Sequence, residues 1–215
     1  MTDKTFTDKL AQLRSRFCDQ LPTPEVAVLA RATARLRRSG ILSDSLQTGE
    51  TVPDFEFIAQ CGGKRRLYQL LEQGPVVLNF FRGFWCSWCK TELEAYREIH
   101  ADLAGIGVSY LAISPQRIPE QSPLIDGCDV IFDRNNQIAR HFGIVYRLEE
   151  EEVALFRGWG LDLLAVNDTA VPELPLPATY LIKQDRSIGY RFVDVDFRER
   201  CCPEALIDEI HQLAR

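Results

Sequence analysis

The stretch Val76-Val-Leu-Asn-Phe-Phe-Arg-Gly-Phe-Trp-Cys-Ser-Trp-Cys89 decides the fold of this 215-residue chain. Its apolar run, Val76 to Phe81, is interrupted at Arg82-Gly83. The residues that follow repeat apolar side chains at helical spacing, at Leu93, Tyr96, Ile99 and Leu103. This order predicts a buried strand, a loop and a helix, with Cys86 and Cys89 where the helix begins.

Cys86 and Cys89 are well placed for thiol chemistry. Side chains three residues apart share a helix face with Cβ atoms about 5–6 Å apart, so a small adjustment of the first turn reaches disulfide distance. Free N–H groups and the helix dipole stabilise a thiolate there and lower its pKa from about 8.5. Because the thiolate is the nucleophile, the two cysteines are predicted to form a redox-active dithiol/disulfide centre.

The CxxC spacing also suits half of a zinc site, which needs four tetrahedral ligands. Cys201-Cys202 is the only other close cysteine pair, and the three histidines show no ligand spacing. We therefore expect neither a metal nor a cofactor. Cys201 and Cys202 are an alternative source of a third redox thiol, but we favour spectator roles for them. We expect the same of Cys18, of Cys61 at an exposed turn, and of Cys128 as a small buried side chain.

Composition narrows the classes of function. A net charge of −6 argues against a nucleic-acid partner, which requires a basic face. The longest apolar runs are strand-sized, so no membrane span is expected. The N-terminus has no apolar signal region, and seven dispersed cysteines fit a reducing compartment. These features predict a cytoplasmic protein.

Two helices are predicted between about residues 6 and 38, and they define an N-terminal helical arm over residues 1–45. Thr23-Pro24 gives the second helix an N-cap and a proline at its first turn. The arm is either a contact for a homodimer or another partner, or a helical hairpin packed on its own domain. We favour the hairpin.

Residues 46–215 are predicted to form one α/β domain. The pattern predicts β structure from Val52 and a short helix over Leu67–Leu71, then strands over Val108–Ile113, Asp129–Asp133, Ala178–Ile182 and Ile188–Val195, and helices over Ile138–Phe142 and Glu204–Leu213. An insertion of about 144–175 contains a helix that opens with four glutamates, Glu149 to Glu152. It is either a lid over the redox site or an insertion that buries its own apolar face, and we favour the second.

This arrangement resembles the thioredoxin fold, a central mixed β-sheet flanked by helices, here with an N-terminal helical extension. Five stretches resemble more closely the peroxiredoxin-like branch of the alkyl hydroperoxide reductase and thiol-specific antioxidant group. They are Val52-Pro-Asp-Phe55, Val77-Leu-Asn-Phe-Phe-Arg-Gly83, Trp85-Cys-x-x-Cys89, Ala112-Ile-Ser-Pro-Gln116 and Pro177-Ala-Thr-Tyr-Leu-Ile182. The resemblance covers about residues 50 to 213 and implies an oxidoreductase of antioxidant defence or redox homeostasis.

The resemblance leaves two registers open. Peroxiredoxins carry Pro-x-x-x-Thr-x-x-Cys and an arginine before a later strand, and in that register Cys89 is peroxidatic while Arg82 replaces the proline. Pro177 then stands where the arginine is expected, although Glu92 retains the family's acidic residue. In the thioredoxin register Cys86 is the nucleophile, Cys89 resolves it, and Pro177 is a cis-proline packed against the disulfide.

Two neighbours are predicted to support the thiols. Trp85 would form an apolar platform for a partner or pack over the helix start, and Arg82 would lower a thiol pKa or remain a solvated charge. Because the family's proline, threonine and arginine are all absent, the sequence favours thiol–disulfide exchange over peroxide reduction. The substrate would be an oxidised protein, and the donor would be a thioredoxin-like protein or a small-molecule thiol.

Two alternatives to exchange remain. The first is an atypical peroxiredoxin that reduces hydrogen peroxide or alkyl hydroperoxides with Cys89 or Cys86. The second is a non-enzymatic redox-sensing module that binds a partner through the acidic insertion and the arm.

Overall fold

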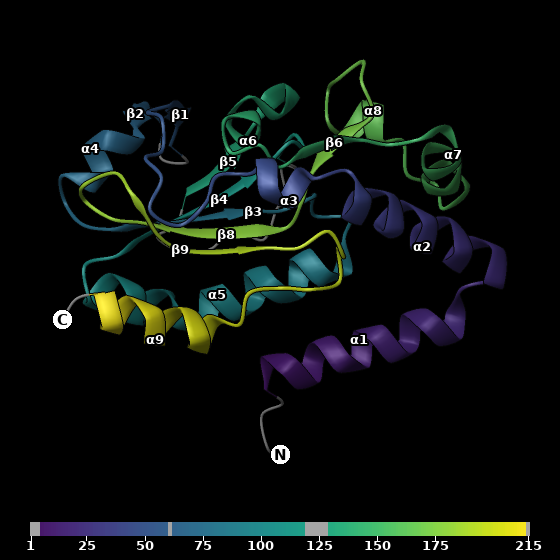
Figure 1. The fold of residues 1–215 in the computed structure, drawn as a ribbon, viewed down its shortest axis with the longest axis horizontal. Helices are drawn as coiled ribbons and strands as arrows, with labels where there is room; N and C mark the ends of the chain where they lie inside the picture. Colours follow the sequence, from purple (N-terminus) through teal and green to yellow (C-terminus); the bar gives the residue numbers. More distant parts are fainter. Residues whose placement is uncertain (1–4, 60–61, 119–128, 214–215) are drawn as a thin grey trace.

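The computed structural model describes residues 5–59, 62–118 and 129–213. Within these ranges the chain forms a central five-stranded sheet, two small two-stranded sheets, and helices around them (Figure 1). Cys61 and Cys128, expected to be spectators, lie outside the described residues, as does the side chain of Cys18. No helix in the described part of the chain has the length and apolar character needed to cross a membrane.

The central sheet is mixed. Its strand order is β5 (Asp129–Phe132), β4 (Ser109–Ser114), β3 (Val76–Phe80), β8 (Ala178–Ile182) and β9 (Ile188–Val193). Strand β3 pairs parallel with β4 and antiparallel with β8. All five of its side chains are buried, because a central strand is covered on both faces, and this is why its sequence is a continuous apolar run.

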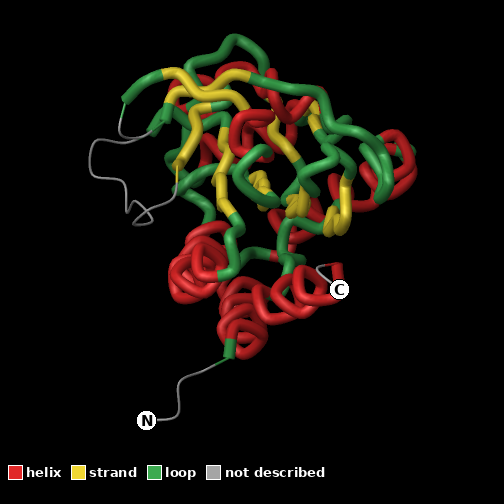
Figure 2. Tube along the Cα trace, turned by 90° about the vertical axis from the view of Figure 1, so that its left-hand side faces the viewer, coloured by secondary structure: helices red, strands yellow, loops and turns green. Residues whose placement is uncertain are grey.

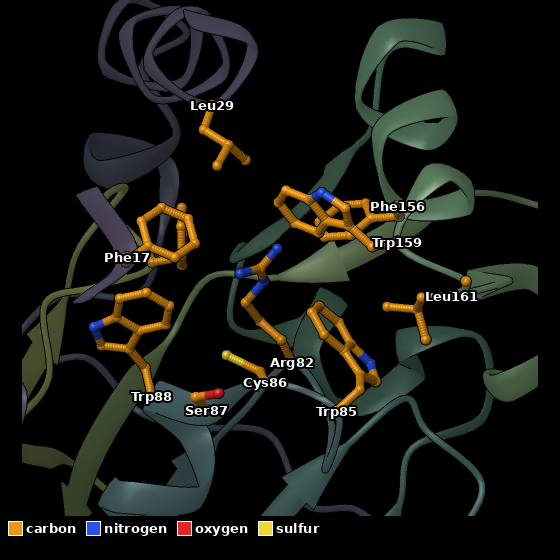
Figure 3. A pocket seen from close by; sticks show the side chains of 12 residues that line it. Phe17, Leu29, Arg82, Trp85, Cys86, Ser87, Trp88, Phe156, Trp159 and Leu161 are labelled. Carbon is orange, nitrogen blue, oxygen red and sulfur yellow. The ribbon is translucent and has the colours of Figure 1, made fainter. Parts of the chain in front are cut away.

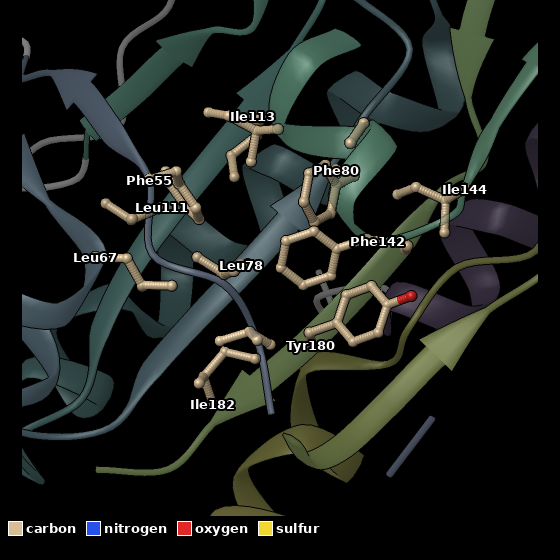
Figure 4. Packing of buried hydrophobic residues seen from close by; sticks show 14 of the residues in the cluster. Phe55, Leu67, Leu78, Phe80, Leu111, Ile113, Phe142, Ile144, Tyr180 and Ile182 are labelled. Carbon is tan, nitrogen blue, oxygen red and sulfur yellow. The ribbon is translucent and has the colours of Figure 1, made fainter. Parts of the chain in front are cut away.

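Helices cover both faces of this sheet (Figure 1). On one face, Val77 and Phe81 join a cluster with residues of α5 (Ser87–Gly105) and α9 (Pro203–Leu213). On the other face, Leu78 and Phe80 join a cluster with residues of α4 (Leu67–Leu71) and α6 (Gln137–His141) (Figure 4). The alternation follows from the two-residue period of a strand.

Shorter elements surround this frame. They are α3 (Ile41–Asp44), the paired strands β1 (Glu56–Ile58) and β2 (Lys64–Arg66), η1 (Arg134–Asn136), α8 (Leu163–Val166), and the paired strands β6 (Val145–Arg147) and β7 (Glu173–Pro175). The β structure predicted from Val52 begins only at Glu56. Before Glu56, Thr51 forms only an isolated bridge with Ser187, and Val52 N donates to Arg186 O at 3.0 Å while the Tyr68 hydroxyl donates to Val52 O at 2.8 Å. Pro53 has no N–H to donate to a ladder, so this pairing does not continue as a strand.

The N-terminal arm packs on the rest of its own chain. Helix α1 (Phe6–Gln20) contacts α5, and α2 (Thr23–Arg38) contacts α7 (Glu150–Gly158). The two views in Figures 1 and 2 show both arm helices outside the sheet, with α1 alongside the α5 side of the molecule. The arm therefore covers the end of α5 that carries the two cysteines.

The insertion does more than bury its own apolar face. Leu148, Phe156, Leu163 and Leu174 form a small cluster of their own. Phe156 also packs edge-on against Trp85, with ring centroids 5.4 Å apart. The expectation that the insertion only buries its own face is therefore wrong, because the same aromatic side chain contacts the residue that precedes Cys86.

Candidate active site

A sharp turn after β3 positions the cysteines. Gly83 has φ +151°, and a Cβ at this position would lie 2.4 Å from Nε1 of Trp85 and 2.6 Å from Oε1 of Gln116. Only a glycine therefore fits this close approach. The N–H of Phe84 donates to the same Gln116 oxygen at 2.6 Å. Because Gln116 follows β4, this bond ties the turn to the ends of two adjacent strands.

The turn delivers Cys86 to the N-cap of α5 and Cys89 to its first turn. Both thiols are free and buried, Cys86 at 4% and Cys89 at 0% exposure. A hydrogen bond from the Cys89 thiol, the positive charges of Arg82 and Arg200, and the Cys89 backbone N–H outweigh burial and lower the pKa of Cys86 to about 5. Burial raises the pKa of Cys89 well above its ordinary value, and the neighbouring Cys86 reinforces that shift.

Arg200 is the site residue that the sequence motifs missed. Its Nη2 lies 3.3 Å from Sγ of Cys89 and 3.9 Å from Sγ of Cys86. Its Nε lies 2.9 Å from Oε2 of Glu92, and both side chains are fully buried. The sequence predicts Arg82 at the thiols and no counterpart of the family's later arginine, and Arg200 shows that the second expectation is wrong. The guanidinium arrives from the loop before α9, whereas the family register places it at Pro177, and no local spacing links residues so far apart.

Although Arg200 is nearer to Cys89, we assign the thiolate to Cys86. Cys89 lies deeper, and its proton is the one that bonds to the Cys86 sulfur. The carboxyl group of Glu92 already contacts Arg200 at 2.9 Å, and burial raises the pKa of that carboxyl to about 8. The pair is therefore arranged as a thiolate that faces the cavity and a thiol behind it.

Arg82 is buried beside Cys86. Its side chain is 3% exposed, and its Cζ lies 4.6 Å from the ring centroid of Phe197, 4.9 Å from that of Trp85 and 5.6 Å from that of Phe156. Each distance is within the range of a cation–π contact. The predicted supporting residues Arg82 and Trp85 are therefore brought together with Cys86.

Pro177 is buried at the start of β8, next to Ala178, which pairs with Phe80. The described residues contain no cis peptide bond, so the predicted cis-proline is wrong. The backbone is bonded on both sides of the Leu176–Pro177 bond, since Leu176 N donates to Ile144 O at 2.8 Å and Asp194 N donates to Pro177 O at 3.4 Å. The trans form continues the extended chain into β8.

A cavity of about 400 Å³ lies over Cys86 (Figure 3). The arm contributes Phe17 and Leu29, the turn contributes Arg82 and Trp85, and the insertion contributes Phe156, Trp159 and Leu161. Ligand-binding cavities of small molecules span roughly 300–1,000 Å³. The site is therefore sized for a small molecule at the sulfur of Cys86.

The other described thiols are poor nucleophiles. Burial raises the pKa of Cys201 to about 12, and the hydroxyl of Tyr190 lies 3.8 Å from its sulfur. Burial also raises the pKa of Cys202, whose sulfur is 2.8 Å from Oε2 of Glu204. Because both pKa values are raised, neither Cys201 nor Cys202 is favoured as a third redox thiol. Across the described ranges no group of three His, Cys, Asp or Glu side chains is arranged to hold a metal ion.

We compared the chain with known protein families and with proteins of similar sequence. The sequence model of the AhpC/TSA family matches residues 48–191. A 103-residue stretch is 31% identical to proteins from two strains of Mycobacterium tuberculosis that carry the name peroxiredoxin, covering 46% of this chain and 67% of each relative.

Solved structures show the same fold. The crystal structure of peroxidoxin BcpB from Mycobacterium tuberculosis aligns with a TM-score of 0.59 at 22% identity, over 78% of this chain and 98% of that chain. A mutant of peroxiredoxin 6 from Arenicola marina aligns with a TM-score of 0.60 at 18% identity, over 79% of this chain and 76% of that one. The predicted thioredoxin-like α/β fold is confirmed.

Proposed function

Because this chain belongs to the AhpC/TSA family and is a thiol-based oxidoreductase, we propose that it reduces hydroperoxides with Cys86 as the attacking thiolate and Cys89 as the resolving thiol. The observation that carries the proposal is the position of Cys86, a low-pKa thiol between two arginines at the base of a cavity of about 400 Å³. A small hydroperoxide fits such a cavity.

The reaction has three steps. The Cys86 thiolate attacks the terminal oxygen of ROOH, the O–O bond breaks, and Cys86 becomes a sulfenic acid while RO⁻ takes a proton from water. The thiol of Cys89 then attacks the sulfenic sulfur, forming a disulfide and releasing water. Two equivalents of an external thiol, from a thioredoxin-like protein or a small molecule, restore the dithiol.

Two arginines support this chemistry. The positive charges of Arg82 and Arg200 favour the thiolate in the ground state, and guanidinium donors stabilise the negative charge that develops on the leaving oxygen. The sequence favoured thiol–disulfide exchange because the family's proline, threonine and later arginine are all absent from their expected positions. Arg200 lies within 4 Å of both sulfurs, so the arginine part of that reason no longer holds.

Thiol–disulfide exchange with a protein remains the second candidate, because a low-pKa first cysteine and a buried second cysteine suit it equally. Its difficulty is access. Cys86 is 4% exposed, and Phe17 of the arm and Phe156 of the insertion both line the cavity over it. A protein disulfide would need these elements to move before in-line attack.

Stopped-flow oxidation of the reduced protein tests the proposal. Tryptophan fluorescence is followed with hydrogen peroxide and with cumene hydroperoxide, for wild type, Cys86→Ser and Cys89→Ser. Complete ionisation alone accelerates a thiol by at most roughly thirtyfold at pH 7, so we expect wild type to exceed free cysteine by more than that. Cys86→Ser should abolish the phase, and Cys89→Ser should retain it and accumulate a sulfenic acid that dimedone traps.

The same experiment separates the alternatives. Loss of the fast phase in Cys89→Ser, with its retention in Cys86→Ser, would give the peroxidatic role to Cys89. If no hydroperoxide reacts faster than ionisation explains, while a protein disulfide oxidises the pair through Cys86, the peroxidase proposal is wrong and exchange takes its place.

A further inference from the structure

We propose that Arg82 binds the carboxylate of the substrate, so that the cavity selects hydroperoxides with an apolar body and one carboxylate group. The inference rests on the proposed function and specifies its substrate class. It depends on three observations: a buried cation without a carboxylate partner among the described residues, the rings that hold it, and a cavity lining that is uncharged apart from Arg82 and the Cys86 thiolate.

Arg82 is a buried cation for which the described residues provide no carboxylate partner. Its side chain is 3% exposed, and its buried Nε has no hydrogen-bond partner. None of the ion pairs between described residues involves Arg82. Arg200 provides the contrast, because it is equally buried but has Glu92 at 2.9 Å and accepting carbonyls at Phe197 and Glu199. Buried arginines are almost always paired. The N–H groups of the Arg82 guanidinium are therefore available to a ligand.

Three aromatic rings hold the guanidinium of Arg82 in position. Trp85 comes from the turn after β3, Phe156 from the insertion and Phe197 from the loop before α9, and each ring centroid lies within 5.6 Å of Cζ of Arg82. Cation–π contacts orient a guanidinium without neutralising it. Figure 3 shows the guanidinium directed into the cavity on the same side as Cys86. The arrangement holds a charge at the cavity and leaves its hydrogen-bonding edge free.

The lining defines the rest of the substrate. Of the described residues that line the cavity, Arg82 is the only cation and the Cys86 thiolate the only anion, and most of the others are aromatic or aliphatic. An apolar body would pack against Phe17, Leu29 and Leu161. One guanidinium matches one carboxylate through two parallel hydrogen bonds, whereas a phosphate dianion would keep an uncompensated charge in an apolar cavity.

The proposed reaction is compatible with a substrate carboxylate close to the Cys86 thiolate. In the ground state the Cys86 thiolate shares the field of Arg82. Attack on the terminal peroxide oxygen forms the S–O bond and breaks the O–O bond, and the alkoxide leaves as an alcohol after taking a proton from water. Because sulfenic acid is neutral, the carboxylate becomes the sole anion beside Arg82 once the oxygen has been transferred.

Ligand binding tests the proposal without turnover. The probes are 4-isopropylbenzoate and its uncharged counterpart 4-isopropylbenzamide, followed by fluorescence of the tryptophans at the cavity, for wild type, Arg82→Met and the exposed control Arg37→Met. We expect wild type and Arg37→Met to bind the carboxylate at least tenfold more tightly than the amide, and Arg82→Met to lose this preference. Cys86→Ser should bind the carboxylate more tightly than wild type, because it removes the competing thiolate. Equal binding of the two probes to wild type, or an unchanged preference in Arg82→Met, would overturn the proposal.

Reaction kinetics distinguish an error in the proposed carboxylate site from an error in the proposed peroxidase function. The carboxylate of 4-carboxycumene hydroperoxide and its methyl ester are compared as oxidants. Because Arg82 also acts on the Cys86 pKa, the informative quantity is the ratio of the two second-order rate constants, which should be at least ten in wild type and near one in Arg82→Met. If both oxidants react rapidly at equal rates, the carboxylate site is wrong and the peroxidase stands. If neither reacts and the carboxylate still binds, the peroxidase is wrong and the site stands.

Discussion

At the scale of single residues, the two cysteines differ although they are three positions apart. Cys86 lies at the helix N-cap and faces the cavity, whereas Cys89 lies one turn deeper at 0% exposure. The largest single cause of the low Cys86 pKa is the hydrogen bond donated by the Cys89 thiol. Cys89 therefore has two roles in the proposed reaction, as the donor that stabilises the thiolate and as the thiol that later resolves it.

Replacing the donor tests this coupling. Cys89→Ala removes the hydrogen bond, so the pKa of Cys86 should rise from about 5 by roughly one unit or more. Cys89→Ser keeps an O–H donor and should shift it less. The pKa is read from the pH dependence of iodoacetamide alkylation of Cys86, with peptide mapping, because the rate rises through the pKa and is flat above it. Identical midpoints for Ala and Ser would show that the hydrogen bond is not the cause.

At the scale of elements, α2 and α7 are joined across the open side of the site. Arg31 pairs with Glu151 at 2.6 Å, and Arg35 pairs with the buried Glu152 at 2.6 Å. Nε1 of Trp159 donates to Glu25 at 2.7 Å. The Arg31–Glu151 pair is exposed, and exposed pairs contribute little individually, so we expect the aromatic contacts of the arm and the insertion to contribute more to shielding Cys86 from solvent.

The sequence predicts the elements better than it predicts the site. Strand β3, helix α5 and strand β8 have clear local periodicity, and each forms within a residue or two of its expected bounds. Arg82 and Trp85 could be selected because they adjoin the CxxC motif. Phe17, Phe156 and Arg200 could not, because only tertiary packing brings them to Cys86 and no pattern in a single sequence encodes that proximity.

Shortening one aromatic side chain of the arm tests whether the arm limits access to Cys86. Phe17 packs edge-on against Trp88, with centroids 4.8 Å apart, and lies 6.0 Å from Phe197. Such pairs contribute about 0.5–1.5 kcal/mol, so Phe17→Ala should increase labelling of Cys86 by a bulky maleimide roughly two- to tenfold. N-ethylmaleimide should gain less, because it needs less opening.

The comparison is made in a Cys89→Ser background with peptide mapping, and the matched control is Arg16→Ala on the exposed side of the same helix. An equal gain for the small and the bulky reagent would indicate general unfolding of the arm. If labelling of Cys86 increases with neither reagent, Phe17 does not shield Cys86.

At the scale of the whole molecule, the central sheet separates two apolar cores. The thiols belong to the core between the sheet, α5 and α9. The opposite core contains Phe80, Phe142 and Tyr180, and Phe142 lies 4.9 Å from each of the other two rings by centroid (Figure 4). The chemistry and the larger share of the packing therefore lie on opposite faces of the same five strands.

This separation predicts that stability and thiol reactivity respond to different substitutions. Phe142 is fully buried, so Phe142→Ala should lower the free energy of unfolding by about 3–5 kcal/mol, whereas Ile106→Ala at an exposed position should change it by less than about 0.5 kcal/mol. Neither should move the midpoint of Cys86 alkylation, because the arginines and Cys89 that set its pKa lie across the sheet. Urea unfolding of the reduced protein and the alkylation profile are measured on the same samples, under conditions where each variant is folded. A shift of the Cys86 midpoint in folded Phe142→Ala would show that the sheet transmits core packing to the thiols, and the two cores would then have to be treated as one mechanical unit.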